Sequence, residues 1–418
     1  MNPFTPKIPR GIIYHSIAES LEYLFLSLVK PLDQWEKVRE FEKAFAAYCG
    51  RQHCVAFPFA RTALYSVLEH LKLPSGTQVL MPCITIKGIL DVIVDLGLEP
   101  VYVDSDPQTA GFLLEDLRGK IGPRTKVALV THLFGLVPDM GAMLKVLKNN
   151  GVYVIEDFSQ CLNGRFEDRK VGTFGEVGIY SSSSIKTLDC LGGGMAITDD
   201  PVLAGSLREK QEGLGPPDRK FLVQKAWTNL VRNLATKQPF YSMFTFPFLQ
   251  VLRWRNPALA LKQTGNRDQQ RIAKLPGLWF RRFTSFQAQI GLKHLGAVGS
   301  GDQVRRSNVE FIKSKCGPAR FPQTTTRSWN VYWQLILLVP NAMEAQSFLA
   351  GWGVDSATSS LELISALKDY SNRSELPNAE RIYHNGLFIP CYPHLTTKGL
   401  ERIALAVQSY FQGRVDGK

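Results

Sequence analysis

Lys186 lies between a cluster of serine hydroxyls and a cluster of glycines in the stretch YSSSSIKTLDCLGGG, which runs from Tyr180 to Gly194. A lysine amine can form a Schiff base with an aldehyde, and the hydroxyl of Ser181, five residues earlier, can bind a phosphate oxygen. Since an isolated loop lysine is a solvated charge in most proteins, this stretch alone leaves both interpretations open. No helical pattern follows the glycines at 192–194, which favours a turn with close packing over a phosphate cradle.

A second candidate group ends the apolar run VIEDFSQ at residues 154–160. A buried strand that ends in Glu156 and Asp157 places a carboxylate at the edge of a sheet, with Gln160 three residues after Asp157. Such a carboxylate can stay ionised beside the protonated ring nitrogen of a bound cofactor. The alternative is an ordinary helix cap, because Asp and Glu follow many strands in that role.

The third candidate is FARTAL, residues 59–64, where a strand pattern runs into a helix pattern. The backbone N–H groups of the first helical turn, at Arg61 and Thr62, can hold a phosphate, and the helix dipole favours negative charge there. Arg61 by itself is unfavourable for the dipole, which favours an anion bound nearby. A solvated arginine beside an ordinary cap is the alternative.

Short apolar runs alternate with helical patterns between about residue 53 and residue 200. This alternation predicts an α/β fold, with three layers in the order α/β/α around a mostly parallel sheet. After residue 201 the pattern becomes aromatic and basic and predicts helices through about residue 275, and NVYWQLILLVP (330–340) predicts a later strand. The strands of the main sheet are expected in HCVAFPF, QVLMP, EPVYVD, KVALVTHLFG, VYVIED, EVGIYSSS and GGMAITDD.

The candidate groups all fall on strand ends of this one predicted sheet. In open α/β sheets, ligands bind where strands end and helices begin, so we expect the groups to lie close together. Pyridoxal 5'-phosphate needs this set: an anion site, an acid near the pyridine nitrogen, a hydrogen bond to the ring hydroxyl and an amine.

The segment from VIEDFSQ through GGGMAITDD resembles the DegT/StrS-type, pyridoxal-phosphate-dependent sugar aminotransferases. Blocks such as VTHLFG, TSFQAQIGLKHL and LFIPCYPHLTTKGLERI extend the resemblance from roughly residue 35 to the end, in the family's order. The resemblance implies the aspartate-aminotransferase-like fold type I. We therefore expect a large cofactor-binding domain over 1–300, with a basic aromatic helical insertion at about 201–275, and a small C-terminal α+β domain over 301–418.

The resemblance also implies a role for each candidate residue. Lys186 matches the lysine that binds the cofactor and later moves protons. Asp157 matches the acid that keeps the pyridine nitrogen protonated, and Gln160 matches the glutamine near the ring's 3-hydroxyl. The phosphate contacts match three further positions: the hydroxyl of Ser181 and the backbone at Arg61 and Thr62.

Three departures from the family pattern concern the surroundings of this site. Ile86, in PCITIK, stands where the family often has an aromatic side chain that stacks on the cofactor ring. The asparagine that many relatives send from the partner subunit to the phosphate is replaced near Phe280 and Arg281. The segment 201–275 is much longer than the corresponding family stretch.

Charge and cysteine content limit the partners and the compartment. The chain of 418 residues has a formal net charge of +12, and the stretch 208–282 holds 15 Lys/Arg against 4 Asp/Glu. No nucleic-acid-binding module accompanies this charge, so no nucleic acid is expected as a partner. The composition of FYSMFTFPFLQVLRWR suits contact with an anionic membrane surface, with packing on a partner subunit as the alternative. Seven scattered cysteines without a C-x-x-C pair argue against a disulfide framework or a zinc site, so no metal is expected, and they favour the cytoplasm.

The leading hypothesis is a homodimeric aminotransferase. It would take an amino group from glutamate and deliver it to a keto-sugar, linked to a nucleotide, in polysaccharide or glycan biosynthesis. One alternative is a pyridoxal-phosphate enzyme that acts on a non-sugar ketone or aldehyde, and another is a non-catalytic, cofactor-binding scaffold or regulator. The presence of Lys186 favours catalysis, because a scaffold has no need of an aimed amine.

Overall fold

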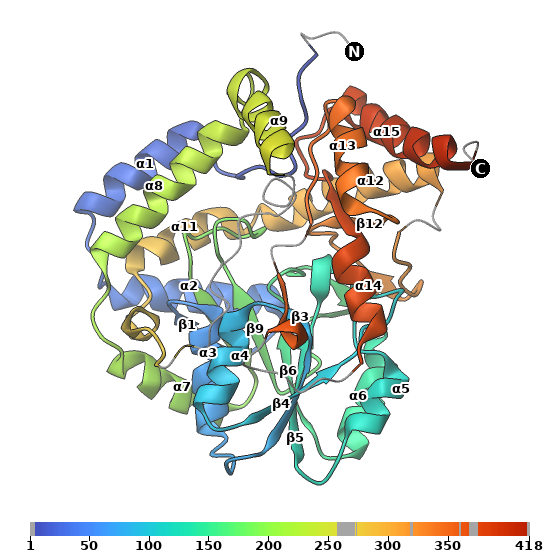
Figure 1. Cartoon of the computed structure of the whole chain (residues 1–418). Coiled ribbons are helices and arrows are strands. Elements are labelled where there is room, and N and C mark those ends of the chain that lie inside the picture. Colours follow the sequence, from blue (N-terminus) through green and yellow to red (C-terminus); the bar gives the residue numbers. More distant parts are fainter. Residues whose placement is uncertain are drawn as a thin grey trace.

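A seven-stranded sheet forms the centre of the molecule and is covered by helices on both faces (Figure 1). The computed structural model describes residues 5–256, 272, 274–317, 321–358, 361–367 and 375–415. The strand order is β1-β10-β9-β6-β5-β2-β4, which confirms the predicted α/β fold with a mostly parallel sheet. Its strands are β1 (His53–Phe57), β2 (Gln78–Pro82), β4 (Glu99–Val103), β5 (Thr125–Thr131), β6 (Tyr153–Asp157), β9 (Val177–Ser181) and β10 (Gly194–Thr198).

Each face of the sheet has its own apolar core. Because side chains alternate along a strand, Val55 and Phe57 of β1 point into one core while Cys54 and Ala56 point into the other. The first core is covered by α3 (Ala60–His70), α4 (Lys87–Asp95) and α7 (Pro201–Gly213). The second is covered by α2 (Trp35–Cys49), α5 (Leu114–Lys120), α6 (Met140–Asn149) and α11 (Ser285–Leu295).

Strand β10 is the exception to the parallel order, since it runs antiparallel to both β1 and β9. A parallel return requires a crossover connection, usually a helix. The connection between β9 and β10, residues 182–193, contains no helix, so the chain turns back beside the strand it has just left. This connection carries Lys186.

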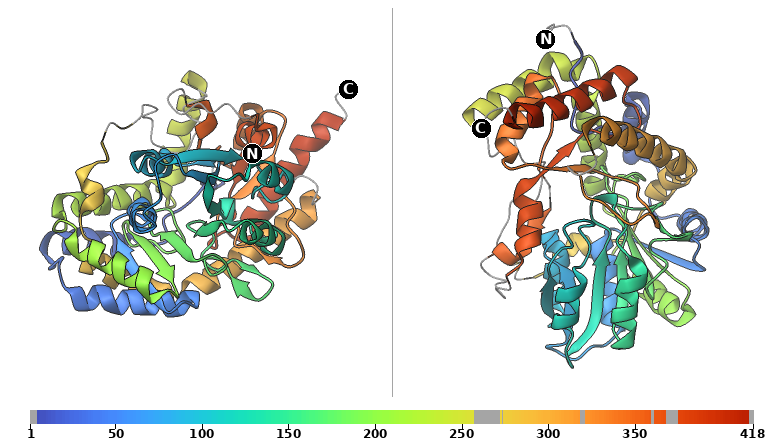
Figure 2. Two further views of the ribbon diagram at one scale, coloured as in Figure 1. Left: turned by 90° about the horizontal axis from the view of Figure 1, so that it is seen from below. Right: turned by 90° about the vertical axis from the view of Figure 1, so that its right-hand side faces the viewer.

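The C-terminal elements lie together at one end of the sheet (Figure 2, right). Their strands β12 (Leu335–Leu338) and β14 (Gly386–Ile389) pair antiparallel. The helices around them are α12 (Val298–Cys316), α13 (Ala342–Gly351), α14 (Pro377–Asn385) and α15 (Thr397–Val415). The chain passes the expected boundary at residue 300 inside α12, and the division into two domains stays a prediction.

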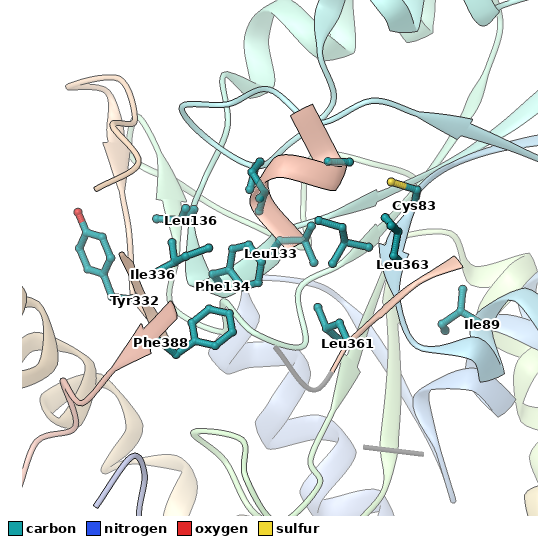
Figure 3. Close-up of a cluster of buried hydrophobic side chains, with 14 of the residues drawn as sticks. Cys83, Ile89, Leu133, Phe134, Leu136, Tyr332, Ile336, Leu361, Leu363 and Phe388 are labelled. Carbon is teal, nitrogen blue, oxygen red and sulfur yellow. The ribbon is translucent and has the colours of Figure 1, made fainter. Parts of the chain in front are cut away.

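A continuous apolar cluster joins these C-terminal elements to the strand ends of the main sheet (Figure 3). The rings of Phe134, which follows β5, and Phe388, in β14, lie 5.2 Å apart. Leu363, in the short strand β13 (Glu362–Leu363), pairs with Ile84 in β3 (Ile84–Thr85). The two parts of the chain therefore share one core next to the strand ends.

The strand predicted at 330–340 is only partly correct, because β12 begins at Leu335. Residues 330–334 form a loop whose backbone is bonded elsewhere: the N–H groups of Val331 and Tyr332 donate to the carbonyl oxygen of Gly135. Gln334 N–H donates to the carbonyl oxygen of Phe134 at 3.2 Å. These bonds hold the loop against the end of β5 and not in a sheet.

The predicted helices of the segment 201–275 are confirmed as far as the structure describes that segment. They are α7, α8 (Arg219–Thr236), the single-turn helix η2 (Tyr241–Thr245) and α9 (Phe246–Arg255), followed later by η3 (Gly277–Phe280). Residues 257–271 and 273 of the segment lie outside the described residues. The first helix of the chain, α1 (Ile17–Val29), packs beside α8 (Figure 1).

Gly194 is expected to be essential for the packing of α3 on the sheet. A Cβ at Gly194 would lie 2.1 Å from the backbone nitrogen of Ala60, the first residue of α3. Gly194→Ala should therefore lower the free energy of unfolding by at least about 2 kcal/mol, because the helix must move. Urea unfolding of the purified protein measures the change.

Gly205→Ala is the matched control for this substitution. Gly205 lies inside α7 with nothing within 4 Å of an added Cβ, so its replacement should be neutral or stabilise by up to about 1 kcal/mol. Equal losses of stability in the two variants would contradict the packing argument.

Candidate active site

The β9–β10 connection brings the predicted lysine into the interior of the molecule. Lys186 is 8% exposed, and its Nζ lies 3.9 Å from the centroid of the Trp333 ring. The indole N–H of Trp333 donates to the carbonyl oxygen of Ile185 at 2.8 Å, which fixes the ring beside the lysine. Lys186 is therefore held by its surroundings and is not a solvated loop charge.

Burial changes the acidity of this amine. It lowers the pKa of Lys186 from 10.5 to about 8, and the negative charge of Asp157 opposes that effect. Asp157 ends β6, the neighbour of β9 in the sheet, and is half-buried. The two groups interact electrostatically at the same end of the sheet, and about a tenth of the amine is neutral at pH 7.

The structure separates the roles of the two adjacent carboxylates. Glu156 is fully buried and accepts hydrogen bonds from the backbone N–H groups of Gly172 and Gly175, while His132 Nε2 lies 3.0 Å from its Oε2. Burial raises the pKa of Glu156, but these partners outweigh burial and hold it below the usual value. Asp157 faces the other side, where, among the described residues, its Oδ1 accepts only from the N–H of Ser159 at 2.9 Å. Glu156 is thus held by the protein itself, and a role of Asp157 at a cofactor stays a prediction.

Gln160 is oriented by an unusual backbone conformation at the end of β5. Its Oε1 accepts a hydrogen bond of 2.7 Å from the N–H of Phe134, whose φ of 60° is uncommon for a residue with a side chain. Gly135, with φ of 78°, lies against the backbone of the 332–333 loop. The Nε2 end of Gln160 is therefore the end available to a ligand.

Ser181 and the first turn of α3 lie on opposite sides of the same glycines. Ser181 pairs with Gly194 across β9 and β10, and Gly193 bridges to Phe59, which precedes α3. The neighbouring Ser182 is fully buried and donates its hydroxyl to the carbonyl oxygen of Gly192. Close packing is confirmed as the role of the glycines, since a Cβ at 193 would lie 2.5 Å from the Phe283 ring.

The side chains at the start of α3 are occupied. The Thr62 hydroxyl donates to the carbonyl oxygen of Trp279 at 2.8 Å, and the Arg61 guanidinium lies 4.2 Å from the Trp279 ring and 4.6 Å from the Phe59 ring. Burial lowers the pKa of Arg61 to about 10, opposed by the charge of Asp91. Any phosphate contact at this turn would come from the backbone, and the N–H of Thr62 already lies 3.1 Å from the carbonyl oxygen of Phe59.

A lysine that the sequence did not single out adds positive charge to this turn. Burial lowers the pKa of Lys225 in α8, and the charges of Arg232 and Arg61 lower it further, while Asp189 opposes them. Neither Lys225 nor Arg61 forms an ion pair with a carboxylate in the part of the chain that the structure describes. An anion near the start of α3 would relieve this repulsion.

The positions that depart from the family pattern lie around this site. Ile86 is 42% exposed and caps α4. Phe280 packs edge-on against Tyr65, and its carbonyl oxygen accepts from the N–H of Gly215, while Arg281 bridges to the same glycine. Trp333 was missed by the sequence analysis because it is 147 residues from Lys186 and no local pattern links the two.

The groups at this edge of the sheet match what pyridoxal 5'-phosphate requires. Four polar groups have no hydrogen-bond partner among the described residues: Asp157 Oδ2, Gln160 Nε2, the Ser181 hydroxyl and the Lys186 amine. They supply an acid, an amide donor, a hydroxyl and an amine, next to a helix start with unpaired positive charge. The residues present therefore fit the cofactor, and each individual role stays a prediction.

The fold is that of the fold-type I class of proteins, and the groups at its strand ends are those that this class would need for the cofactor. The sequence pattern of the DegT/DnrJ/EryC1/StrS aminotransferase family matches residues 29–229 and 253–408, and the chain belongs to this family. The aminotransferase from Psychrobacter cryohalolentis has the same fold, with a TM-score of 0.74 at 19% identity, over 98% of this chain and 99% of that one.

Two curated relatives match one part of the chain more closely. The GDP-perosamine synthase of Caulobacter vibrioides is 34% identical over 181 residues, which cover 43% of this chain and 49% of that protein. The spore coat polysaccharide biosynthesis protein SpsC of Bacillus subtilis is 32% identical over 192 residues, 46% of this chain and 48% of that protein. The match thus spans about half the length of these curated relatives.

Removal of the Asp157 charge should change the acidity of Lys186. Asp157→Asn is expected to lower the pKa of the amine below about 8, because the carboxylate is the charge that favours the protonated form. The pH dependence of Lys186 acylation in the cofactor-free protein, followed by peptide mapping, measures this value. Asp168→Asn, at an exposed carboxylate, is the control and should leave the titration unchanged; an unchanged titration in Asp157→Asn would show that the two groups do not share a pocket.

Lys186 should also make stability depend on pH. Its pKa is lower in the folded protein than in the unfolded chain, so the unfolded chain binds more protons between about pH 8 and 10.5 and stability rises with pH there. Lys186→Met should therefore stabilise the cofactor-free protein at pH 7, by up to about 3 kcal/mol, and the gain should shrink towards pH 10.5. Urea unfolding across this range tests it, and the exposed Lys145→Met should show no such trend.

Proposed function

We propose that this protein is a pyridoxal-phosphate-dependent aminotransferase that moves an amino group, taken from glutamate, to a keto-sugar. The observation that carries the proposal is the buried Lys186 amine, with a pKa of about 8, opposed by the charge of Asp157 at the strand ends of a sheet in a chain of this family. Family members that lack this lysine perform dehydration or regulation, so its presence favours transamination.

Each residue has a distinct task in this proposal. The bound cofactor would supply an aldehyde and an electron-accepting ring. The Lys186 amine is partly neutral near pH 7, so its Nζ can act as a nucleophile and afterwards accept and return a proton. The Asp157 carboxylate would hold a proton at the ring nitrogen by pairing with it. Gln160, fixed through Phe134 N–H, would donate from Nε2 to the ring hydroxyl.

Phosphate binding is assigned to the start of α3. The Ser181 hydroxyl and the backbone of Arg61 and Thr62 would contact the phosphate, since the helix dipole and the unpaired charges of Arg61 and Lys225 favour an anion there. Trp333, beside the amine, would exclude water from one side of Lys186.

The names of the relatives support a sugar acceptor. One is a GDP-perosamine synthase and another is a spore coat polysaccharide biosynthesis protein. We therefore propose a nucleotide-linked keto-sugar as the acceptor and polysaccharide or glycan biosynthesis as the setting. The family resemblance further suggests a homodimer with the site between subunits, and the cysteine pattern suggests the cytoplasm. Contact with an anionic membrane surface through residues 201–275 is proposed independently of this chemistry.

Loss of the Lys186 amine should abolish transamination. The purified protein loaded with pyridoxal 5'-phosphate should be yellow, and glutamate should bleach the colour while 2-oxoglutarate forms. Lys186→Ala should reduce that half-reaction by at least about a hundredfold, and addition of a nucleotide-linked 4-keto-hexose to the bleached protein should restore the colour.

The same assay separates the alternatives. A yellow protein that no amino donor bleaches would favour a scaffold or regulator. A protein that glutamate bleaches, but whose colour returns only with simple ketones or aldehydes, would replace the sugar acceptor by a non-sugar one. Lys145→Ala, at an exposed lysine of α6, is the control and should behave like the unchanged protein.

A further inference from the structure

Three stretches of the described chain lie outside the residues that match the family: residues 5–28, residues 230–252 and residues 409–415 at the end of α15. The first contains nearly all of α1, and the second contains the end of α8, the turn η2 and most of α9. The first two stretches are separated by about two hundred residues in the sequence.

The first two of these stretches, residues 5–28 and 230–252, lie against each other in space. Figure 1 shows α1 and α8 side by side along the upper left of the molecule, with α9 above the end of α8. The helices run antiparallel: Asn233 Nδ2 donates to Ser20 Oγ at 2.8 Å near one end, and Arg219 Nη1 donates to the carbonyl oxygen of Ser27 at 2.8 Å near the other. The N–H of Lys7 donates to Ser242 Oγ, which joins η2 to the beginning of the chain.

The outer side of this helix layer is apolar. Tyr23 of α1 and Leu222 and Ala226 of α8 are buried together on Phe286 and Ile290 of α11. On α1 and α8 the side chains opposite these buried residues face away from the molecule, and Phe25, Leu28 and Trp227 are among them. The turn η2 and helix α9 pack separately, through Tyr241 and Phe246 on Ala350, and expose Phe244, Phe248 and Trp254. These six exposed side chains are here called the α1–α9 face.

The exposure of this face is large for a folded protein. Phe248 is 64% exposed and Trp254 is 81% exposed, and single exposed apolar residues are common while such a group is not. Helix α9 exposes apolar side chains over most of its length, so it lacks the polar face that a surface helix normally shows. Exposed apolar groups of this size mark sites that bind a partner or a membrane.

The charges of residues 219–255 indicate which kind of partner fits this surface. Residues 219–255 contain seven Lys/Arg and no Asp or Glu. Arg219, Lys220 and Arg255 are exposed, and Arg255 follows Trp254 directly. Aromatic side chains flanked by cations suit the boundary between acyl chains and anionic head groups, and the seven cations of 219–255 outnumber the two carboxylates of α1, Glu19 and the exposed Glu22. Among the described helices, none is long and apolar enough to cross a bilayer.

We infer that α1, α8, η2 and α9 form one peripheral docking surface for an anionic lipid bilayer. The apolar side chains of the α1–α9 face enter the boundary region, and the cations around them contact lipid phosphates. The surface combines α1 with the helices α8, η2 and α9. Residues 201–275 alone therefore do not make it, and α1 is a necessary part.

The docking surface is also connected to the candidate active site. Asn229 of α8 donates from Nδ2 to Asp189 Oδ2 at 2.8 Å, and Asp189 lies in the same connection as Lys186. Phe221, at the start of α8, packs on Phe59 with ring centroids 5.7 Å apart. A single helix thus carries part of the bilayer surface and supports the loop and helix start of the site.

Vesicle flotation tests the inference with the full chain. The protein should float with vesicles of phosphatidylglycerol mixed with phosphatidylcholine at low salt, bind pure phosphatidylcholine more weakly, and be released as salt rises. The double variant Phe25→Asp/Leu28→Asp in α1 and the double variant Phe244→Ser/Phe248→Ser should each bind at least about tenfold more weakly. Val202→Asp, at an exposed apolar residue of α7, is the control and should bind normally.

Three further measurements separate lipid binding from folding, catalysis and subunit assembly. Circular dichroism and the glutamate half-reaction in solution should be unchanged in all variants, which separates lipid binding from folding and from the aminotransferase proposal. Subunit number by light scattering should also be unchanged. Failure of the unchanged protein to float at low salt would overturn the inference, as would dissociation of an oligomer by the α1 variant, because the face would then bind a second copy of the chain. Normal flotation of the α1 variant would also overturn it, since α1 would then have no part in the surface.

Discussion

The burial of one ammonium group next to one carboxylate constrains the whole strand-end region. An amine that loses water prefers to be neutral, and a nearby negative charge restores part of the preference for the proton. The balance holds the pKa of Lys186 at about 8, within reach of neutral pH. It depends on the depth of the β9–β10 connection and on the position of Asp157 one strand away. The surrounding elements keep Lys186 buried and keep Asp157 at the same end of the sheet.

Close backbone contacts at two places hold this region together: the glycines at 193–194 and the turn at Phe134 and Gly135. Gly193 and Gly194 let the start of α3 approach β10 closely, because any Cβ there would collide with a ring or with the helix backbone. The positive φ of Phe134 aims an N–H at Gln160, and Gly135 admits the 331–334 loop that carries Trp333. The glycines and Phe134 thus position the polar residues of the candidate site, although their own side chains are apolar or absent.

Helices α1, α8 and α9 differ from the rest of the fold in where their apolar side chains lie. Most of the fold hides its apolar side chains in two cores on either side of the sheet, whereas α1, α8 and α9 also leave a set of them outside. Such exposure costs free energy in water, and apolar patches of this kind mark binding surfaces. The absence of carboxylates from 219–255 indicates the sign of the partner's charge.

The sequence by itself determined the α/β fold, the order of its strands along the chain and the helical nature of the basic segment, because periodicity and turn residues are local properties. It also singled out Lys186 and Asp157, since parallel strands place their ends together. Local patterns could not reveal that β10 returns antiparallel, that residues 330–334 form a loop on Gly135, or that Glu156 is turned inward towards His132. The contact of Trp333 with Lys186 and the alignment of α1 with α8 were decided only by tertiary structure, because each joins segments more than a hundred residues apart whose meeting depends on the packing of everything between them.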